Sequence, residues 1–152
     1  GPFNAFLYAP EIGDAAQSLG ELLRFHGVLA GRLRELAILT VAAHWRAQYE
    51  WWAHAKIARV EGLENGIIEA VKMGHAVAGD DGAEIVHLFV SELLKDRNVS
   101  DRTFQAVKAE LGDEALVELV VLVGYYGLIA ATLNVFQVPL PEGEEPPFPG
   151  EV

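Results

Sequence analysis

Hydrophobic residues recur along most of the chain at intervals of three and four, which is the spacing of an amphipathic helix. The first such segment begins at Pro10, where proline suits a first helical turn, and ends at Gly27, which can adopt the left-handed conformation. No segment shows the alternation that is typical of a strand. The pattern therefore predicts an all-α protein of about six to seven helices, with the others at residues 32–44, 47–60, 64–73, 81–97, 101–111 and 113–136.

Polar residues and glycines mark several of the expected helix ends. Asp81, with Glu84 three residues later, resembles a capping box, and Ser100 can cap the helix that follows it. Asn98 and Gly112 are expected to stop the two preceding helices.

Residues 32–60 can form either one long helix or a helical pair. On a continuous helix, Glu35 and Glu50 would lie about 22 Å apart at the rise of 1.5 Å per residue, too far to share a site. A turn at residues 45–47 would instead bring Glu35 alongside the region of His54. We favour the turn.

The last predicted helix contains a stretch, residues 119–137, that carries no charge and approaches the length of a membrane span. Its flanks are acidic rather than basic, which favours a core or subunit-interface helix over a membrane span. Beyond it, five prolines among acidic residues exclude a helix and predict an extended tail. We therefore divide the chain into a helical domain at residues 1–136 and a tail at residues 137–152. The tail wraps over this domain, wraps over a neighbouring subunit or is disordered.

The composition excludes several classes of function. A formal net charge of -11 opposes binding to nucleic acid and to anionic membrane surfaces. The absence of cysteine excludes disulfides and thiolate chemistry, and it suits the cytoplasm, as does the lack of a secretory signal near the start. Residues 32–59 are locally basic, which either serves to attract a small anionic molecule or is an ordinary solvated helix face.

Residues 44–54 hold two histidines, all three tryptophans and one carboxylate. Glu50 and His54 are four apart, so on a helix they share a face, where the carboxylate could hold the imidazole and raise its pKa. This arrangement is typical of a general acid–base pair, but also of a structural pair beside core tryptophans. Glu50 and His54 could also share a metal ion with His44 or Glu35, although known helical metal motifs hold more ligands, and we expect no metal and no cofactor.

Two short motifs stand out in the sequence, Arg-Glu-Leu at residues 34–36 and Tyr-Glu-Trp-Trp-Ala-His-Ala at residues 49–55. With these motifs the chain resembles the carboxymuconolactone decarboxylase and alkylhydroperoxidase D-like superfamily, in a branch without cysteine. The resemblance extends to residues 1–5, 118–126 and 132–141. It implies a compact, oligomeric helical domain, either a trimer or a hexamer.

The resemblance also implies roles for single residues. Glu35 and His54 match the peroxidase branch, but its two cysteine positions fall on Ala47 and Glu50, so thiol-based peroxide reduction is excluded. In the decarboxylase branch a Glu-x-x-x-His element, similar to Glu50 and His54, performs proton transfer. These residues would be catalytic, with Glu35 orienting them or serving as a second acid–base group.

The leading hypothesis is a cofactor-free lyase or isomerase-type enzyme that acts on a small, anionic organic acid or lactone. Arg46 would bind a substrate carboxylate. Trp51, His44 and Tyr49 are expected to line the substrate site, although two adjacent tryptophans are unexpected for so polar a lactone. The alternative is a non-catalytic helical oligomer or binding scaffold, in which the tryptophans would fill the site.

Overall fold

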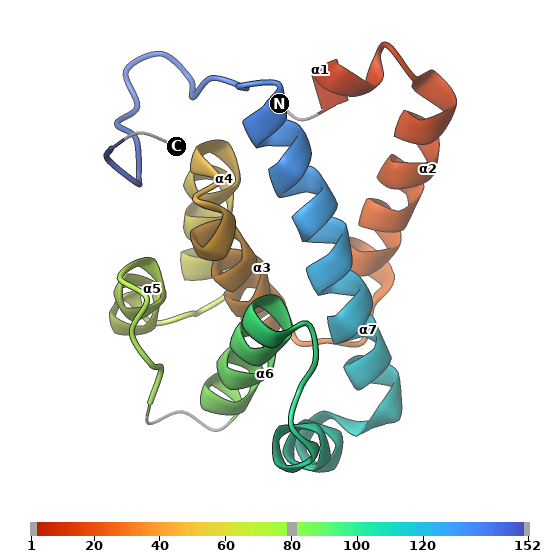
Figure 1. Cartoon of the computed structure of the whole chain (residues 1–152), viewed down its shortest axis with the longest axis vertical. Helices are drawn as coiled ribbons and strands as arrows, with labels where there is room; N and C mark the ends of the chain where they lie inside the picture. Colours follow the sequence, from red (N-terminus) through yellow and green to blue (C-terminus); the bar gives the residue numbers. More distant parts are fainter. Residues whose placement is uncertain (1–2, 79–81, 151–152) are drawn as a thin grey trace.

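The computed structural model describes residues 3–78 and 82–150, which contain seven α-helices, one π-helical turn and no strand. The all-α prediction is therefore confirmed for this part of the chain (Figure 1). In chain order, the helices are α1 (Phe3–Phe6), α2 (Pro10–Glu21), the π-helical turn η1 (Leu22–His26), α3 (Gly31–Trp45), α4 (Gln48–Val60), α5 (Asn65–Lys72), α6 (Ala83–Asp96) and α7 (Asp101–Val135).

Helix α3 forms the centre of the fold and contacts α4, α5, α6 and α7. Its residues from Leu36 to Ala42 are all buried, so it is enclosed on every side rather than along a single stripe. A helix that is apolar all round has to be covered in this way in water. Side chains that α3 contributes to a site are therefore held by close packing on all sides.

The predicted turn between α3 and α4 is present. Arg46 adopts the left-handed conformation, with φ of 49°, and ends α3. Helix α4 then folds back and packs against α3. This packing brings together residues of the two helices that are far apart in the sequence.

Helix α7 begins at the predicted cap, where the Ser100 hydroxyl accepts a hydrogen bond from the backbone N–H of Thr103. At Gly112, φ is 82° and ψ is 172°, which interrupts the helix where the sequence predicts a stop. The part beyond Gly112 runs between α2 on one side and α3 and α4 on the other (Figure 1). By length and composition α7 could cross a membrane, but half of its most apolar window is buried inside this domain.

Three helix ends differ from the predictions. Gly27 ends the first segment in an extended conformation, with φ of -80°, rather than a left-handed one. The carboxylate of Glu118 lies against its Cα and accepts hydrogen bonds from the next two backbone N–H groups, which leaves no room for a Cβ. Arg97, rather than Asn98, turns left-handed to end α6. Gly82 precedes α6 without a side-chain cap, and Asp81 lies outside the described residues.

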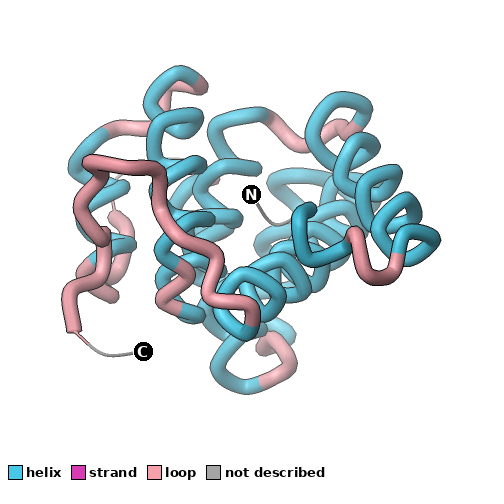
Figure 2. The backbone as a smooth tube through the Cα atoms, turned by 90° about the horizontal axis from the view of Figure 1, so that it is seen from above, coloured by secondary structure: helices cyan, strands magenta, loops and turns pink. Residues whose placement is uncertain are grey.

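The C-terminal tail packs onto the helical domain. Figure 2 shows it as a long loop laid across the outside of the helices. The Phe148 side chain is buried and meets the ring of Trp51 edge-on at 5.2 Å between centroids. Gln48 exchanges two hydrogen bonds with the backbone of Phe148, and Lys56 forms an ion pair with Glu144. The tail therefore covers α4 on its own domain.

Candidate active site

A cavity of about 550 Å³ opens between the α2–η1 segment, α4 and α7. Its volume lies within the range of ~300–1,000 Å³ that small-molecule sites commonly have. Three groups of side chains line it: Gln17, Gly20, Glu21, Arg24 and Phe25 from the first segment, Tyr49, Glu50, Ala53, His54 and Ile57 from α4, and Tyr125, Tyr126, Ile129 and Leu133 from α7. The cavity is mostly apolar, with a few ionisable groups placed among the aromatic rings.

The carboxylate of Glu35, on α3, contacts the imidazole of His54, on α4. The Nδ1 atom of His54 lies 2.7 Å from Oε2 of Glu35, and both side chains are buried. The other carboxylate oxygen of Glu35 lies 3.5 Å from Nε of Arg34. With Nδ1–H donated to an ionised Glu35, the neutral imidazole carries its free lone pair on Nε2. Nε2 is then the ring nitrogen left for a molecule in the cavity.

The aromatic residues of α7 enclose the imidazole. The ring of Tyr126 meets that of His54 edge-on at 5.0 Å, and Tyr125 meets Tyr126 in the same way at 5.2 Å. Burial raises the pKa of both phenols, an effect that Arg24 opposes by its charge. The two tyrosines therefore stay protonated and can serve only as neutral hydrogen-bonding groups.

Glu50 lies in the same cavity without a partner. Its side chain is only 2% exposed, and neither carboxylate oxygen has a hydrogen-bond partner among the described residues. Burial without a compensating charge raises the pKa of Glu50 well above its usual value, because desolvation penalises the charged form. Glu50 is therefore suited to hold a proton, whereas the carboxylate of Glu35 is engaged by the imidazole of His54.

The structure differs from the predicted pairing of Glu50 with His54. Both lie on one face of α4 and line one cavity, as their spacing indicates, but the hydrogen bond to the imidazole comes from Glu35. The reason is the close packing of α3 on α4, which presents a carboxylate to Nδ1 from a neighbouring helix. Glu35, which was assigned an orienting role, is thus the residue in contact with His54.

The remaining predicted site residues divide into two groups. Tyr49 lines the cavity beside Glu50, whereas Arg46, Trp51 and His44 do not. Trp51 is buried beneath Phe148. Arg46 donates a hydrogen bond to the carbonyl of Pro149 and lies 5.6 Å from the ring centroid of Phe148, and His44 lies with it at a second cavity.

Sequence reasoning missed Arg24. It belongs to η1, the π-helical turn that continues α2, and its half-buried side chain lines the cavity. A π-helical turn inserts one extra residue and shifts the helix face, so helical spacing alone does not place Arg24 here. Gly20 lies in the same wall, and its lack of a side chain admits the Tyr125 hydroxyl, which a Cβ would meet. In the sequence, the signal for polar groups on this wall was the pair of tyrosines, Tyr125 and Tyr126, in an otherwise apolar helix, because buried tyrosine hydroxyls need polar surroundings.

Among residues 3–78 and 82–150, no group of three or more His, Asp or Glu side chains is arranged to hold a metal ion. This part of the chain therefore offers no ligand cluster for the alternative metal site that the sequence suggested at Glu50 and His54. The ionisable groups of the cavity are Glu21, Arg24, Glu50 and His54, besides its three tyrosines.

Comparison with known proteins relates the chain to one sequence family and to solved structures. The sequence model of the carboxymuconolactone decarboxylase family matches residues 10–90, a range that includes Glu35, Glu50 and His54. A crystal structure from Agrobacterium tumefaciens superposes with a TM-score of 0.80 at 19% identity, covering 91% of this chain and 96% of that one. That protein is of unknown function, and its description suggests an antioxidant defence protein, AhpD. No curated protein sequence matches the chain.

Proposed function

Since this chain belongs to the carboxymuconolactone decarboxylase family, we propose that it is a cofactor-free enzyme that moves protons on a small organic acid or lactone in the Glu50–His54 cavity. The family match bears out the resemblance seen in the sequence, and the structural match bears out the alkylhydroperoxidase D-like fold. The observation that carries the proposal is the pairing of His54 with buried Glu35 beside a second, unpaired carboxyl group, Glu50.

The two carboxyl groups suit opposite tasks because their surroundings differ. A proton that Nε2 of His54 takes from a substrate creates an imidazolium, whose charge the Glu35 carboxylate at Nδ1 stabilises. Burial raises the pKa of Glu50, which suits it to donate a proton to a substrate carbonyl oxygen or carbanion. Isomerisation uses both steps in turn.

Decarboxylation uses the same groups. The bond between the substrate carbon and its carboxylate breaks, carbon dioxide leaves, and the electron pair stays on the carbon, delocalised into an adjacent carbonyl. A proton from Glu50 then completes the product, and solvent returns a proton to Glu50. No redox step is needed.

Arg24 supports an anionic substrate. It is the one arginine or lysine among the residues that line the cavity, and a guanidinium binds a carboxylate through paired hydrogen bonds. In this proposal it takes the role that the sequence analysis gave to Arg46. Glu21 lines the same cavity but is exposed, so it weakens the attraction only in part.

The alternative functions receive less support. Thiol-based peroxide reduction needs a cysteine, and the chain contains none. A non-catalytic scaffold would be supported by tryptophans filling the site, but no tryptophan lines the cavity.

The proposal is tested by measuring turnover over a panel of carboxylated lactones and β-keto acids. His54→Gln should lower kcat/KM on an accepted substrate by about 10²- to 10⁴-fold, which is the contribution of a general acid or base, with unchanged helicity by circular dichroism. Lys108→Gln is the control, since Lys108 forms an ion pair with Asp113 away from the cavity. Full activity in His54→Gln, or no turnover of any panel member by the intact protein, would contradict the proposal.

We also propose that the chain assembles as a trimer or hexamer. Large apolar side chains are exposed on two neighbouring segments, namely Ile12, Leu19, Leu22 and Phe25 on α2 and η1, and Val117, Val120, Val121 and Leu128 on α7. Exposed apolar surface of this extent favours association of subunits. Light scattering coupled to size exclusion measures the mass directly, and a monomer at micromolar concentration would contradict this part of the proposal.

A further inference from the structure

A second cavity, of about 430 Å³, lies on another part of the molecule, and basic side chains surround it. His44 and Arg46 come from the end of α3, Lys72 from the end of α5, and His87 from the middle of α6. The other lining residues are Thr40, Ala43, Val71, Met73, Gly74, Ser91 and Leu94. None of the lining residues in the described part of the chain is acidic, although acidic residues outnumber basic ones two to one in the chain as a whole, 22 against 11.

Three of these basic side chains are unpaired. No hydrogen bond or ion pair within the described residues engages His44, Lys72 or His87, and Arg46 donates only to the carbonyl of Pro149. Lys72 and Arg46 carry positive charge here with no carboxylate among the described lining residues, so a bound anion would stabilise this surface.

Helix dipoles account for only part of this arrangement. His44 and Lys72 lie in the last turns of α3 and α5, where a cation stabilises the partial negative charge of the helix end. His87 lies in the interior of α6, and Arg46 follows the end of α3 in a left-handed turn. Arg46 can also interact with the end of α3, but the interior position of His87 has no helix-dipole explanation, and its side chain lines the same cavity.

We propose that this second cavity binds a phosphate group, either as free phosphate or as part of a phosphorylated metabolite. The four basic side chains belong to the ends of α3 and α5 and to the middle of α6, and the hydroxyl of Ser91 adds a fifth donor. A tetrahedral dianion offers oxygens in several directions and so suits donors from several elements, whereas a carboxylate offers two oxygens in one plane. The cavity is large enough for the organic part of a phosphate monoester.

The state of His87 fits this role. It is half-buried, and burial lowers its pKa, so in the free protein its ring is mostly neutral near pH 7 and acts as an N–H donor. A dianion beside it would raise that pKa again. The groups that face it in the cavity are Lys72 from α5 and His44 and Arg46 from α3.

The experiment is calorimetric titration of the full chain with inorganic phosphate and, separately, with glycerol phosphate, in buffer held at constant ionic strength with sodium chloride. We expect one saturable site per chain, and an upward shift of the His87 pKa by NMR on addition of the ligand. Equal affinity for the two ligands identifies free phosphate, and tighter binding of the ester identifies a phosphorylated metabolite.

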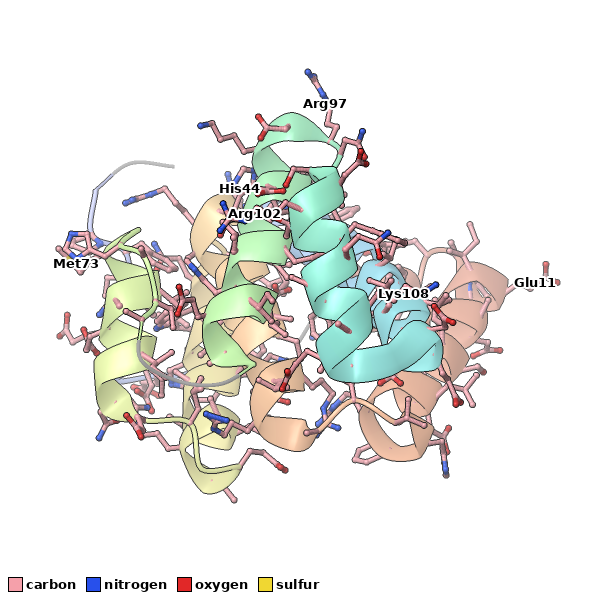
Figure 3. The ribbon with its side chains drawn as sticks, turned by 90° about the horizontal axis from the view of Figure 1, so that it is seen from below. Glu11, His44, Met73, Arg97, Arg102 and Lys108 are labelled. Atoms are coloured by element: carbon pink, nitrogen blue, oxygen red, sulfur yellow. The ribbon has the colours of Figure 1, made fainter. Side chains whose placement is uncertain are left out.

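Two variants locate the site. Lys72→Gln should weaken binding about tenfold, as expected for the loss of one charge-assisted hydrogen bond, and His87→Gln should do the same. The matched control is Lys108→Gln, because Lys108 lies on α7, far from His44 and Met73 in Figure 3 and outside the cavity. His54→Gln should bind phosphate normally, which separates this test from that of the proposed catalytic function.

Three results would overturn the proposal. The first is the absence of saturable binding at millimolar phosphate, which would leave the basic residues as helix-end cations. The second is affinity within twofold of the parent in Lys72→Gln or in a correctly folded His87→Gln. The third is an equal loss of affinity in Lys108→Gln, which would indicate a nonspecific effect of charge.

Discussion

The two buried glutamates allow one chemical change to be made twice with opposite expected effects on stability. Glu35→Gln and Glu50→Gln each replace a buried carboxyl group by an amide of nearly the same shape. Glu35 is bonded to His54, whereas Glu50 has no partner among the described residues. The comparison therefore separates the value of a paired buried charge from the cost of an unpaired one.

For Glu35→Gln we expect the free energy of unfolding at pH 7 to fall by about 1.5–3 kcal/mol, the range for a hydrogen bond to a charged group. Solvent screens this bond little, because Glu35 is 1% exposed and His54 is 8% exposed. Arg34 loses its contact with the other oxygen at 3.5 Å, which adds to the loss. The amide can also turn its NH₂ toward Nδ1 and favour the wrong tautomer of His54, so activity should fall as well.

For Glu50→Gln the sign depends on pH. The folded-state pKa of Glu50 is raised by burial, so the folded protein binds this proton more tightly than the unfolded chain does. The contribution of Glu50 to the free energy of unfolding is fully present below the pKa that this group has in the unfolded chain, about 4.3. This contribution is lost as the pH rises toward the pKa of Glu50 in the folded protein. The variant lacks this titration, so its stability relative to the parent should increase as the pH rises above about 4.3.

The assay is urea denaturation followed by circular dichroism, at one protein concentration because assembly shifts apparent stability. Lys108→Gln again serves as the control variant, prepared and measured in the same way. The reasoning would be refuted if Glu35→Gln were as stable as the parent at pH 7. It would equally be refuted if the stability of Glu50→Gln relative to the parent stayed constant or fell with rising pH.

Three further predictions follow from single contacts. Arg24→Gln should raise KM for an anionic substrate about tenfold with little change in kcat, measured by steady-state kinetics, and an unchanged KM would contradict its binding role. Gly20→Ala should cost about 1–3 kcal/mol by urea denaturation, because the added methyl group meets the Tyr125 hydroxyl, and a neutral result would mean that the tyrosine moves freely. Phe148→Ala should cost about 1.5–3 kcal/mol and expose the tail to proteolysis at a higher rate, and unchanged proteolysis would show that the ring does not anchor the tail.

The helices and many of their ends were accessible from the sequence because they depend on interactions within a few residues. Spacing of apolar residues placed the helices from Pro10 onward, the glycine itself indicated the break at Gly112, and the distance between Glu35 and Glu50 on a continuous helix favoured the turn at residues 45–47. The Ser100 hydroxyl caps its helix by bonding to a backbone N–H only three residues away. The absence of cysteine likewise needs no structure to exclude thiol chemistry. The sequence also singled out Glu35, Glu50 and His54, although without their pairing.

Tertiary structure decided which of those groups meet. Glu35 and His54 are nineteen residues apart, and their contact depends on how α3 and α4 are rotated against each other, which local periodicity does not encode. The same packing leaves Glu50 without a partner and so raises its pKa. Arg24 reaches the cavity through a π-helical turn, while the folding of the tail onto α4 engages Arg46 elsewhere. Charge and proton affinity at this site are therefore properties of the packing, because burial and distance set them and residue order alone does not.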